Sequence, residues 1–191
     1  VIVLVLLARS LGLFETVEWK ALDAFLRWRP AEPTDDRFLI VGVTDADIQQ
    51  VGTYPIPDAD LAALLRALSQ YEPRAIGIDI YRDLPVGTGQ SALAETLQAY
   101  PNIFGIEKVI GTHVPPPPTL PPERVGFVDL PLDQDGFVRR AYLGTLPSGD
   151  TPDLDRFRFS LPLNLAEAYL AAEGLQLDNG LRDPRNMRFG E

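Results

Sequence analysis

The sequence predicts an α/β fold in which a mainly parallel sheet, built from a β-α-β-α-β unit, has helices on both faces. An added antiparallel hairpin and a long N-terminal helix complete the prediction. Three apolar runs rich in β-forming residues alternate with two segments of helical periodicity, and the connections between them are short. Strands joined through helices in this way form right-handed crossovers and hence a parallel sheet.

The first thirty residues predict one long helix over residues 1–29. Residues 1–8 are all apolar, and an amphipathic stripe follows at helical spacing, made of Phe14, Val17, Ala21, Phe25 and Trp28. Pro30 ends the helix. Eight apolar residues are fewer than the about 20 that span a bilayer, so this run is either a buried first element or the last turns of a transmembrane helix. We expect the transmembrane helix, and we divide the chain into 1–29 and an α/β sensor domain at 30–191.

The alternating elements follow residue 36. Each strand is an apolar run, and each helix has its leucines on one face. In chain order, the strand, helix, strand, helix and strand are expected at residues 37–45, 58–71, 74–80, 91–100 and 102–110. Asp58 or Asp60 is expected to cap the first of these helices.

The remainder of the domain has three predicted parts. Residues 112–123 contain six prolines and predict a stiff extended connector. Residues 125–144 predict the hairpin, because two β-rich runs flank the turn sequence Asp-Gln-Asp-Gly. A last helix is expected from about Leu161 to Gly174.

Composition excludes several classes of function. The net charge is −10 although residues 1–30 carry a net charge of +1, so the body of the chain is acidic and unsuited to binding nucleic acid. The chain has no cysteine, which excludes thiol catalysis, disulfides and cysteine-bound metals. No cofactor is predicted.

Asp45 and Asp47 form an Asp-x-Asp motif at the end of a predicted strand. Phosphatases of the haloacid-dehalogenase type use this motif as nucleophile and acid/base beside magnesium. That chemistry also requires a lysine and a further acidic pair, and this chain has only Lys20 and Lys108. A metal-dependent phosphatase-like hydrolase using Asp45 and Asp47 is therefore the alternative function.

Three weaker motifs have simpler interpretations. Residues 86–91 place two glycines before a helix but lack the lysine of a P-loop, so a flexible loop is expected. Residues 129–136 resemble a calcium loop, but the twelfth position from Asp129 is Arg140 rather than glutamate, so a turn without metal is expected. The only histidine, His113, lies in the proline connector and has no Gly-x-Ser-x-Gly partner motif.

A cluster of polar residues follows the predicted strands. Its members are Asp45, Asp79, Arg82, Glu107 and Lys108. Ligands bind at the carboxyl edge of open α/β sheets, so these five residues are the candidate ligand-binding residues. The other interpretation is that the aspartates cap loops and that Arg82 and Lys108 pair with acids.

The order of these pieces resembles the second class of cyclase/histidine-kinase-associated sensory extracellular (CHASE) domains over nearly the whole chain. The resemblance is carried by "LDAFLRWRP", "LIVGVTDADIQQVGTYPIP", "LLRALSQYEPRAIGIDIYRDLPV", "GFVDLPLDQDGFVRR" and "FSLPLNLAEAYL". The family often has Pro-Trp-Pro-Arg where this chain has Pro55, Ile56, Pro57 and Asp58, so a role for that arginine does not carry over. The resemblance implies no ligand residue by residue.

The resemblance implies a non-catalytic, extracytoplasmic sensory domain of a membrane receptor such as a histidine kinase, a nucleotide cyclase or a Ser/Thr kinase. It implies a periplasmic location at the bacterial plasma membrane, with attached transmembrane helices and a cytoplasmic output domain. Receptors of this kind commonly act as homodimers. The stimulus is expected to be a small ligand or a protein.

Overall fold

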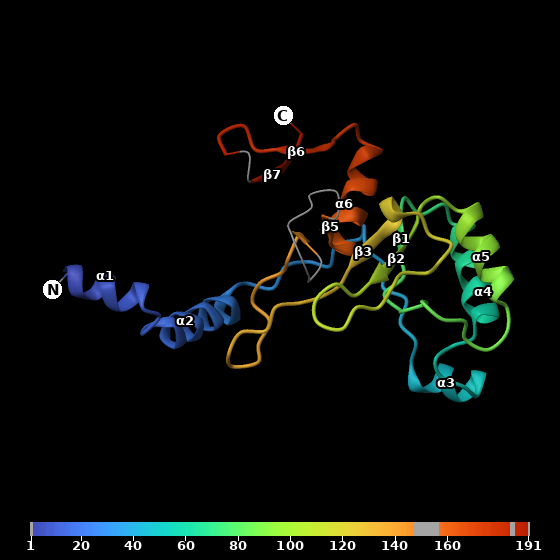
Figure 1. Cartoon of the computed structure of the whole chain (residues 1–191), viewed down its shortest axis with the longest axis horizontal. Coiled ribbons are helices and arrows are strands. Elements are labelled where there is room, and N and C mark those ends of the chain that lie inside the picture. Colours follow the sequence, from blue (N-terminus) through green and yellow to red (C-terminus); the bar gives the residue numbers. More distant parts are fainter. Residues whose placement is uncertain (1, 147–156, 184–185, 191) are drawn as a thin grey trace. The chain divides into compact units, whose positions relative to one another are not determined.

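The structure is a computed structural model that describes residues 2–146, 157–183 and 186–190 (Figure 1). The chain forms two compact units, Val1–Val43 and Thr44–Glu191. The described residues form six α-helices, a three-stranded parallel sheet and two antiparallel strand pairs. The predicted α/β class is therefore confirmed.

The first unit contains two helices instead of the single helix predicted at 1–29. Helix α1 is Ile2–Ser10 and helix α2 is Glu15–Trp28. Between them the amide of Gly12 donates to Arg9 O and the amide of Leu13 donates to Ala8 O, while Gly12 has φ +75°. These are the hydrogen bonds of a Schellman motif, which ends a helix at a glycine in the left-handed region. The prediction of one helix is wrong because Gly12, in the left-handed region, ends α1.

The first predicted strand, at 37–45, is also absent. Residues 38–43 are exposed, with 91% of Ile40 accessible, and no strand pairing involves them within the described residues. Helix α3, Asp45–Val51, begins where that strand was expected to end. A run of β-forming residues favours extended backbone but does not supply the neighbouring strand that a ladder requires.

The parallel sheet instead has the order β1-β2-β3, with strands Ile76–Gly77, Ile103–Glu107 and Val125–Phe127. The central strand β2 is buried at all five positions. Helix α5, Gln90–Ala99, connects β1 to β2, and the proline-rich connector with the 3-10 turn η1, Pro122–Arg124, leads to β3.

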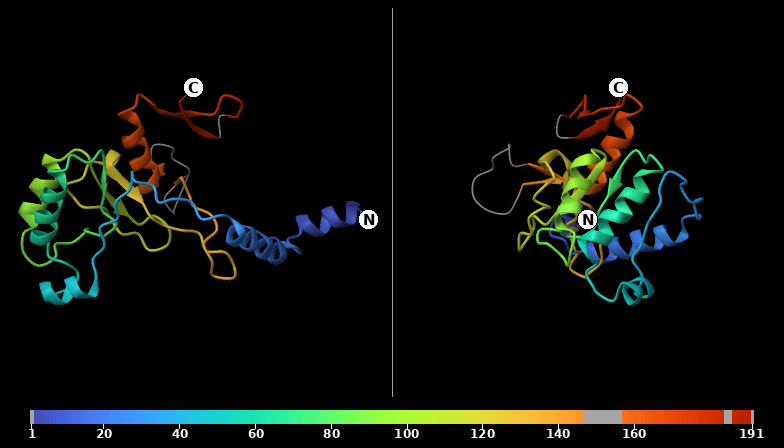
Figure 2. Two further views of the ribbon diagram at one scale, coloured as in Figure 1. Left: turned by 180° about the vertical axis from the view of Figure 1, so that it is seen from behind. Right: turned by 90° about the vertical axis from the view of Figure 1, so that its right-hand side faces the viewer.

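One face of the sheet is covered by α5 and by α4, Asp58–Ser69, which contact each other (Figure 2). Leu61 and Leu65 of α4 and Leu93 and Leu97 of α5 belong to the same buried cluster as Ile103. These helices lie close to their predicted positions, because leucine spacing of three and four is a local signal.

The other face is covered by α6, Leu161–Ala171. Leu161 packs with Phe104 and Ile106, and the Asn164 side chain donates to Val125 O at 3.0 Å. Helices therefore lie on both faces of the sheet, as predicted.

The hairpin predicted at 125–144 is replaced by β3 and an irregular loop. The turn itself forms, because the amide of Asp133 donates to Phe137 O and Gly136 adopts φ +82°. The antiparallel pairs lie elsewhere, and they are β4 with β5, Gly144–Thr145 with Arg158–Phe159, and β6 with β7, Leu177–Asn179 with Met187–Phe189. The prediction failed because Val125–Phe127 pairs in parallel with β2.

Candidate ligand site at the carboxyl edge of the sheet

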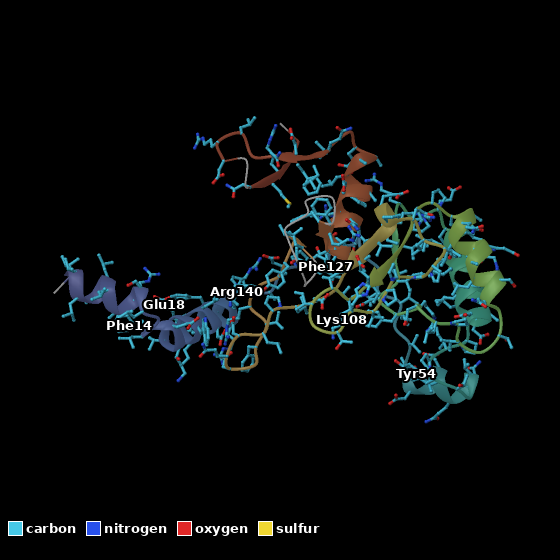
Figure 3. The ribbon with its side chains drawn as sticks, viewed as in Figure 1. Phe14, Glu18, Tyr54, Lys108, Phe127 and Arg140 are labelled. Atoms are coloured by element: carbon cyan, nitrogen blue, oxygen red, sulfur yellow. The ribbon has the colours of Figure 1, made fainter. Side chains whose placement is uncertain are left out.

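Parallel strands bring their carboxyl ends to one edge of the sheet, and polar side chains gather there. Asp79 follows β1, Glu107 ends β2 and Asp129 follows β3. Lys108 and Phe127 mark the ends of β2 and β3 in Figure 3. Helix α4 precedes β1 and α5 follows it, so the first turns of both helices also lie at this edge.

A buried ion pair between Asp58 and Arg82 joins α4 to the loop after β1. The residues are 2% and 5% exposed, and Asp58 Oδ1 lies 3.4 Å from Arg82 Nε. Asp58 Oδ2 accepts a hydrogen bond from the amide of Val86, and Arg82 Nη2 donates to Ile56 O at 2.7 Å. Burial lowers the pKa of the Arg82 guanidinium, and the charge of the Asp58 carboxylate opposes this shift.

A cavity of about 80 Å³ adjoins this pair. It lies between the first turns of α4 and α5 and the proline-rich connector. Its polar lining consists of Asp58, Arg82, Asp83, Gln90 and Thr119, and leucines and prolines form most of the remainder. Asp58 Oδ1 and Arg82 Nε have no hydrogen-bond partner, although they face each other as an ion pair. Two buried polar atoms therefore retain hydrogen-bonding capacity beside an open volume.

Glu107 belongs to a second charged group at the same edge. Its carboxylate is buried, with Oε1 3.2 Å from Arg158 Nε and Oε2 3.6 Å from His113 Nε2. The neighbouring Lys108 is half-buried and its backbone forms a bridge to Val114. Glu107 thus pairs with residues from β5 and from the connector.

Asp129 is a third acid at this edge, and it accepts hydrogen bonds from the amides of Val109 and Ile110. Burial raises the pKa of Tyr81, and the charges of Asp129 and Asp79 raise it further. The sequence predicts Asp129 in a hairpin and therefore does not predict its position at this edge, which follows from the parallel pairing of β3.

The structure separates the five predicted ligand residues. Arg82 lines the cavity, Glu107 is in the second group, Asp79 is exposed beside Tyr81, and Asp45 is exposed in the first turn of α3. No hydrogen bond or ion pair joins any two of the five within the described residues. Sequence reasoning also treated Asp58 as a helix cap, whereas the cap position is Pro57. Asp58 and Arg82 are 24 positions apart in the sequence, and no sequence pattern indicates that they form an ion pair.

Asp47, one half of the Asp-x-Asp motif, is held by its own helix. The amide and the hydroxyl of Thr44 both donate to Asp47 Oδ2, at 2.8 and 2.6 Å, and these bonds lower the pKa of Asp47. This is a capping box. Within the described residues, no group of three or more acidic or histidine side chains is arranged to hold a metal ion. The structure thus accounts for Asp47 as a capping residue of α3.

In the turn that resembles a calcium loop, two arginines form ion pairs with Asp133 and Asp135. Arg139 contacts Asp133 and Asp135 at 3.0 and 2.8 Å, and Arg140 donates to Asp133. The hydrogen bonds from Arg140 and Arg139 lower the pKa of Asp133. The side chains that resembled metal ligands are thus the acceptors of a local ion-pair network.

This network predicts a pH-dependent contribution to stability. A depressed pKa in the folded state gives stability that is present above the ordinary value of about 3.9 and is lost as the pH falls through the folded-state pKa. Asp133→Asn is expected to lower the free energy of unfolding at pH 7, and the difference from wild type should shrink below about pH 4. Urea unfolding at several pH values measures it, with Asp60→Asn, an exposed aspartate of α4, as the control. A difference that does not vary with pH would contradict this role.

Comparison with known proteins gives one match. A family model described as CHASE2 domain matches residues 1–189. No curated protein and no solved structure matches the chain. Within the described residues, none of the helices has both the length and the apolar character needed to span a membrane.

Proposed function

The chain belongs to the CHASE2 family of sensory extracellular domains of receptors, and from this premise we propose that it is the signal-input domain of a membrane-bound bacterial receptor. The domain is non-catalytic and lies on the periplasmic face of the plasma membrane. Its output is a cytoplasmic module of the histidine kinase, nucleotide cyclase or Ser/Thr kinase type. The match over residues 1–189 is the observation that carries this proposal.

The stimulus is a small ligand that enters the cavity beside Asp58 and Arg82. A volume of about 80 Å³ holds several water molecules or a compound of few non-hydrogen atoms. The lining favours a ligand with an apolar part against Leu93 and Leu97 and a polar group near Gln90 or Thr119. Of the five edge residues predicted from the sequence, Arg82 lines this cavity, whereas Asp45, Asp79, Glu107 and Lys108 are not part of its lining.

Signal transmission follows from differential binding. A ligand that binds one conformation of the α/β unit more tightly shifts the population toward that conformation. The shift reaches the output module through the N-terminal helices and the attached transmembrane helices. The receptor acts as a homodimer, so the shift is shared by two copies.

A thermal-shift screen of the 191-residue chain against small metabolites tests the ligand site. A compound present at about 100 times its Kd stabilises the native state by about 2.7 kcal/mol, which corresponds to an increase in Tm of about 5–10 °C for a domain of this size. Ala94 of α5 lines the cavity, so Ala94→Leu is expected to abolish the increase.

Ala99→Leu is the matched control, because it adds the same side chain at an exposed position of the same helix. It should leave the ligand-induced increase in Tm unchanged. An equal increase in the wild type and in Ala94→Leu would place the ligand elsewhere. A screen without any increase would favour a protein stimulus over a small ligand.

A further inference from the structure

Helix α1 has apolar side chains around its whole circumference. Residues 2–8 are all apolar, and the large side chains among them are 46–79% exposed. A helix that is apolar on all sides is buried either in the core of a large protein or in a membrane, and residues 2–7 lie in no protein core within the described part of their own unit. The surroundings that fit α1 are therefore lipid.

Helix α2 is amphipathic, and its apolar residues include Trp19, Leu22 and Leu26 in addition to the face described next. Phe14, just before the helix, and four residues of α2 form a continuous face, namely Val17, Ala21, Phe25 and Trp28. Val17, Phe25 and Trp28 are 65%, 65% and 77% exposed. Glu18 lies one position after Val17 of this face, and its carboxylate forms an ion pair with Arg9 Nε at 2.8 Å. Within the described part of the first unit, residues 2–43, this face is therefore exposed and has a paired acid at its border.

The chemistry of α2 is that of a membrane–water interface. Trp28 lies on this face, and it forms an edge-to-face pair with Phe25, with ring centroids 6.1 Å apart. Tryptophan is enriched at the headgroup level, where its apolar ring and its polar N–H both find partners. Lys20 and Arg27 lie on the opposite side of the helix, as in helices that rest on a lipid surface.

We infer that α2 lies in the headgroup region of the bilayer, with the face of Phe14, Val17, Phe25 and Trp28 turned toward the acyl chains. This inference rests on the proposed membrane receptor. The Schellman turn at Gly12 ends α1 and lets α2 take a different direction from a helix that enters the membrane. Three acidic and three basic residues balance each other between Glu15 and Arg29, so apolar burial rather than attraction to anionic lipid holds the helix.

Fluorescence of the 191-residue chain in lipid vesicles tests this placement. In Trp19→Phe, Trp28 is the only tryptophan and reports on α2 alone. Vesicles of phosphatidylcholine brominated in the upper acyl chain are expected to quench most of the Trp28 emission and to shift the remainder to the blue. Addition of anionic lipid should change the affinity by less than about fivefold. Residues 1–30 carry a net charge of +1, and one charge near an anionic lipid surface is worth about 1 kcal/mol, which is about fivefold in affinity.

Two glutamate substitutions in this background separate the faces of the helix. Phe25→Glu is expected to abolish the quenching of Trp28 while the chain still sediments with the vesicles through α1. Thr16→Glu, nine positions away and on the opposite side of the helix, should leave the quenching unchanged. If the Trp19→Phe chain without a glutamate substitution sediments with the vesicles but its Trp28 emission is not quenched, the placement of α2 is overturned and membrane anchoring is not. Absence of sedimentation would contradict the anchoring itself. A blue shift that depends on protein concentration and resists bromolipid would assign the face to a second copy of the chain.

Discussion

Replacing Arg82 with methionine is expected to lower the free energy of unfolding by about 3–5 kcal/mol. The substitution leaves the Asp58 carboxylate buried without its counter-ion and removes the donor to Ile56 O. An uncompensated buried charge is among the most destabilising changes in a folded protein. Urea unfolding at pH 7, compared with the wild type, measures the loss.

Two further variants identify the cause of that loss. Arg66→Met removes an exposed arginine that donates one hydrogen bond to Thr96, and it should cost about 1 kcal/mol or less. The double variant Arg82→Met with Asp58→Leu should regain much of the stability, because an apolar pair can replace a buried ion pair. An Arg82→Met protein that is as stable as Arg66→Met would show that the pair is solvated in the native state.

The two helices of the α/β core and the parallel pairing of β1 with β2 could be predicted from the sequence, whereas the break in the N-terminal helix and the pairing of the other β-rich runs could not. The helices expected at 58–71 and 91–100 form at 58–69 and 90–99, because their leucine spacing depends only on neighbouring residues. Strand pairing joins residues that are distant in the sequence. The apolar run at 38–43 and the run at 125–127 are both β-rich, yet only the second forms part of the sheet.

The same distinction explains the candidate site. Arg82 was selected because it follows a strand, and that strand is β1 of the sheet. Asp45 was selected by the same rule from a strand that the sheet lacks, and it lies in α3 instead. Asp129 was missed because its strand was assigned to a hairpin. Each site residue was predicted only as well as the strand before it.

Replacing Gly126 with alanine is expected to lower the free energy of unfolding by about 3 kcal/mol, at the upper end of the range for overpacking a core. A Cβ at this position of β3 would lie 2.5 Å from the N and Cα atoms of Leu161 and 2.9 Å from the carbonyl carbon of Ser160. These are backbone atoms at the start of α6, which cannot rotate away as a side chain can. The helix must therefore move off the sheet and weaken the hydrogen bond from Asn164 to Val125 O.

Two other glycines provide a graded control by urea unfolding. Gly77→Ala should cost less than Gly126→Ala, because its Cβ would meet the end of the Leu165 side chain at 2.7 Å, and that side chain can change rotamer. Gly42→Ala should stay within about 0.5 kcal/mol of the wild type, since no atom lies within 4 Å of the added Cβ. The expected order of destabilisation is Gly126, Gly77 and then Gly42. Equal losses of stability for Gly126→Ala and Gly77→Ala would mean that α6 moves away from the sheet as easily as the Leu165 side chain changes rotamer. The close contact between β3 and α6 would then not determine the position of this helix on the sheet.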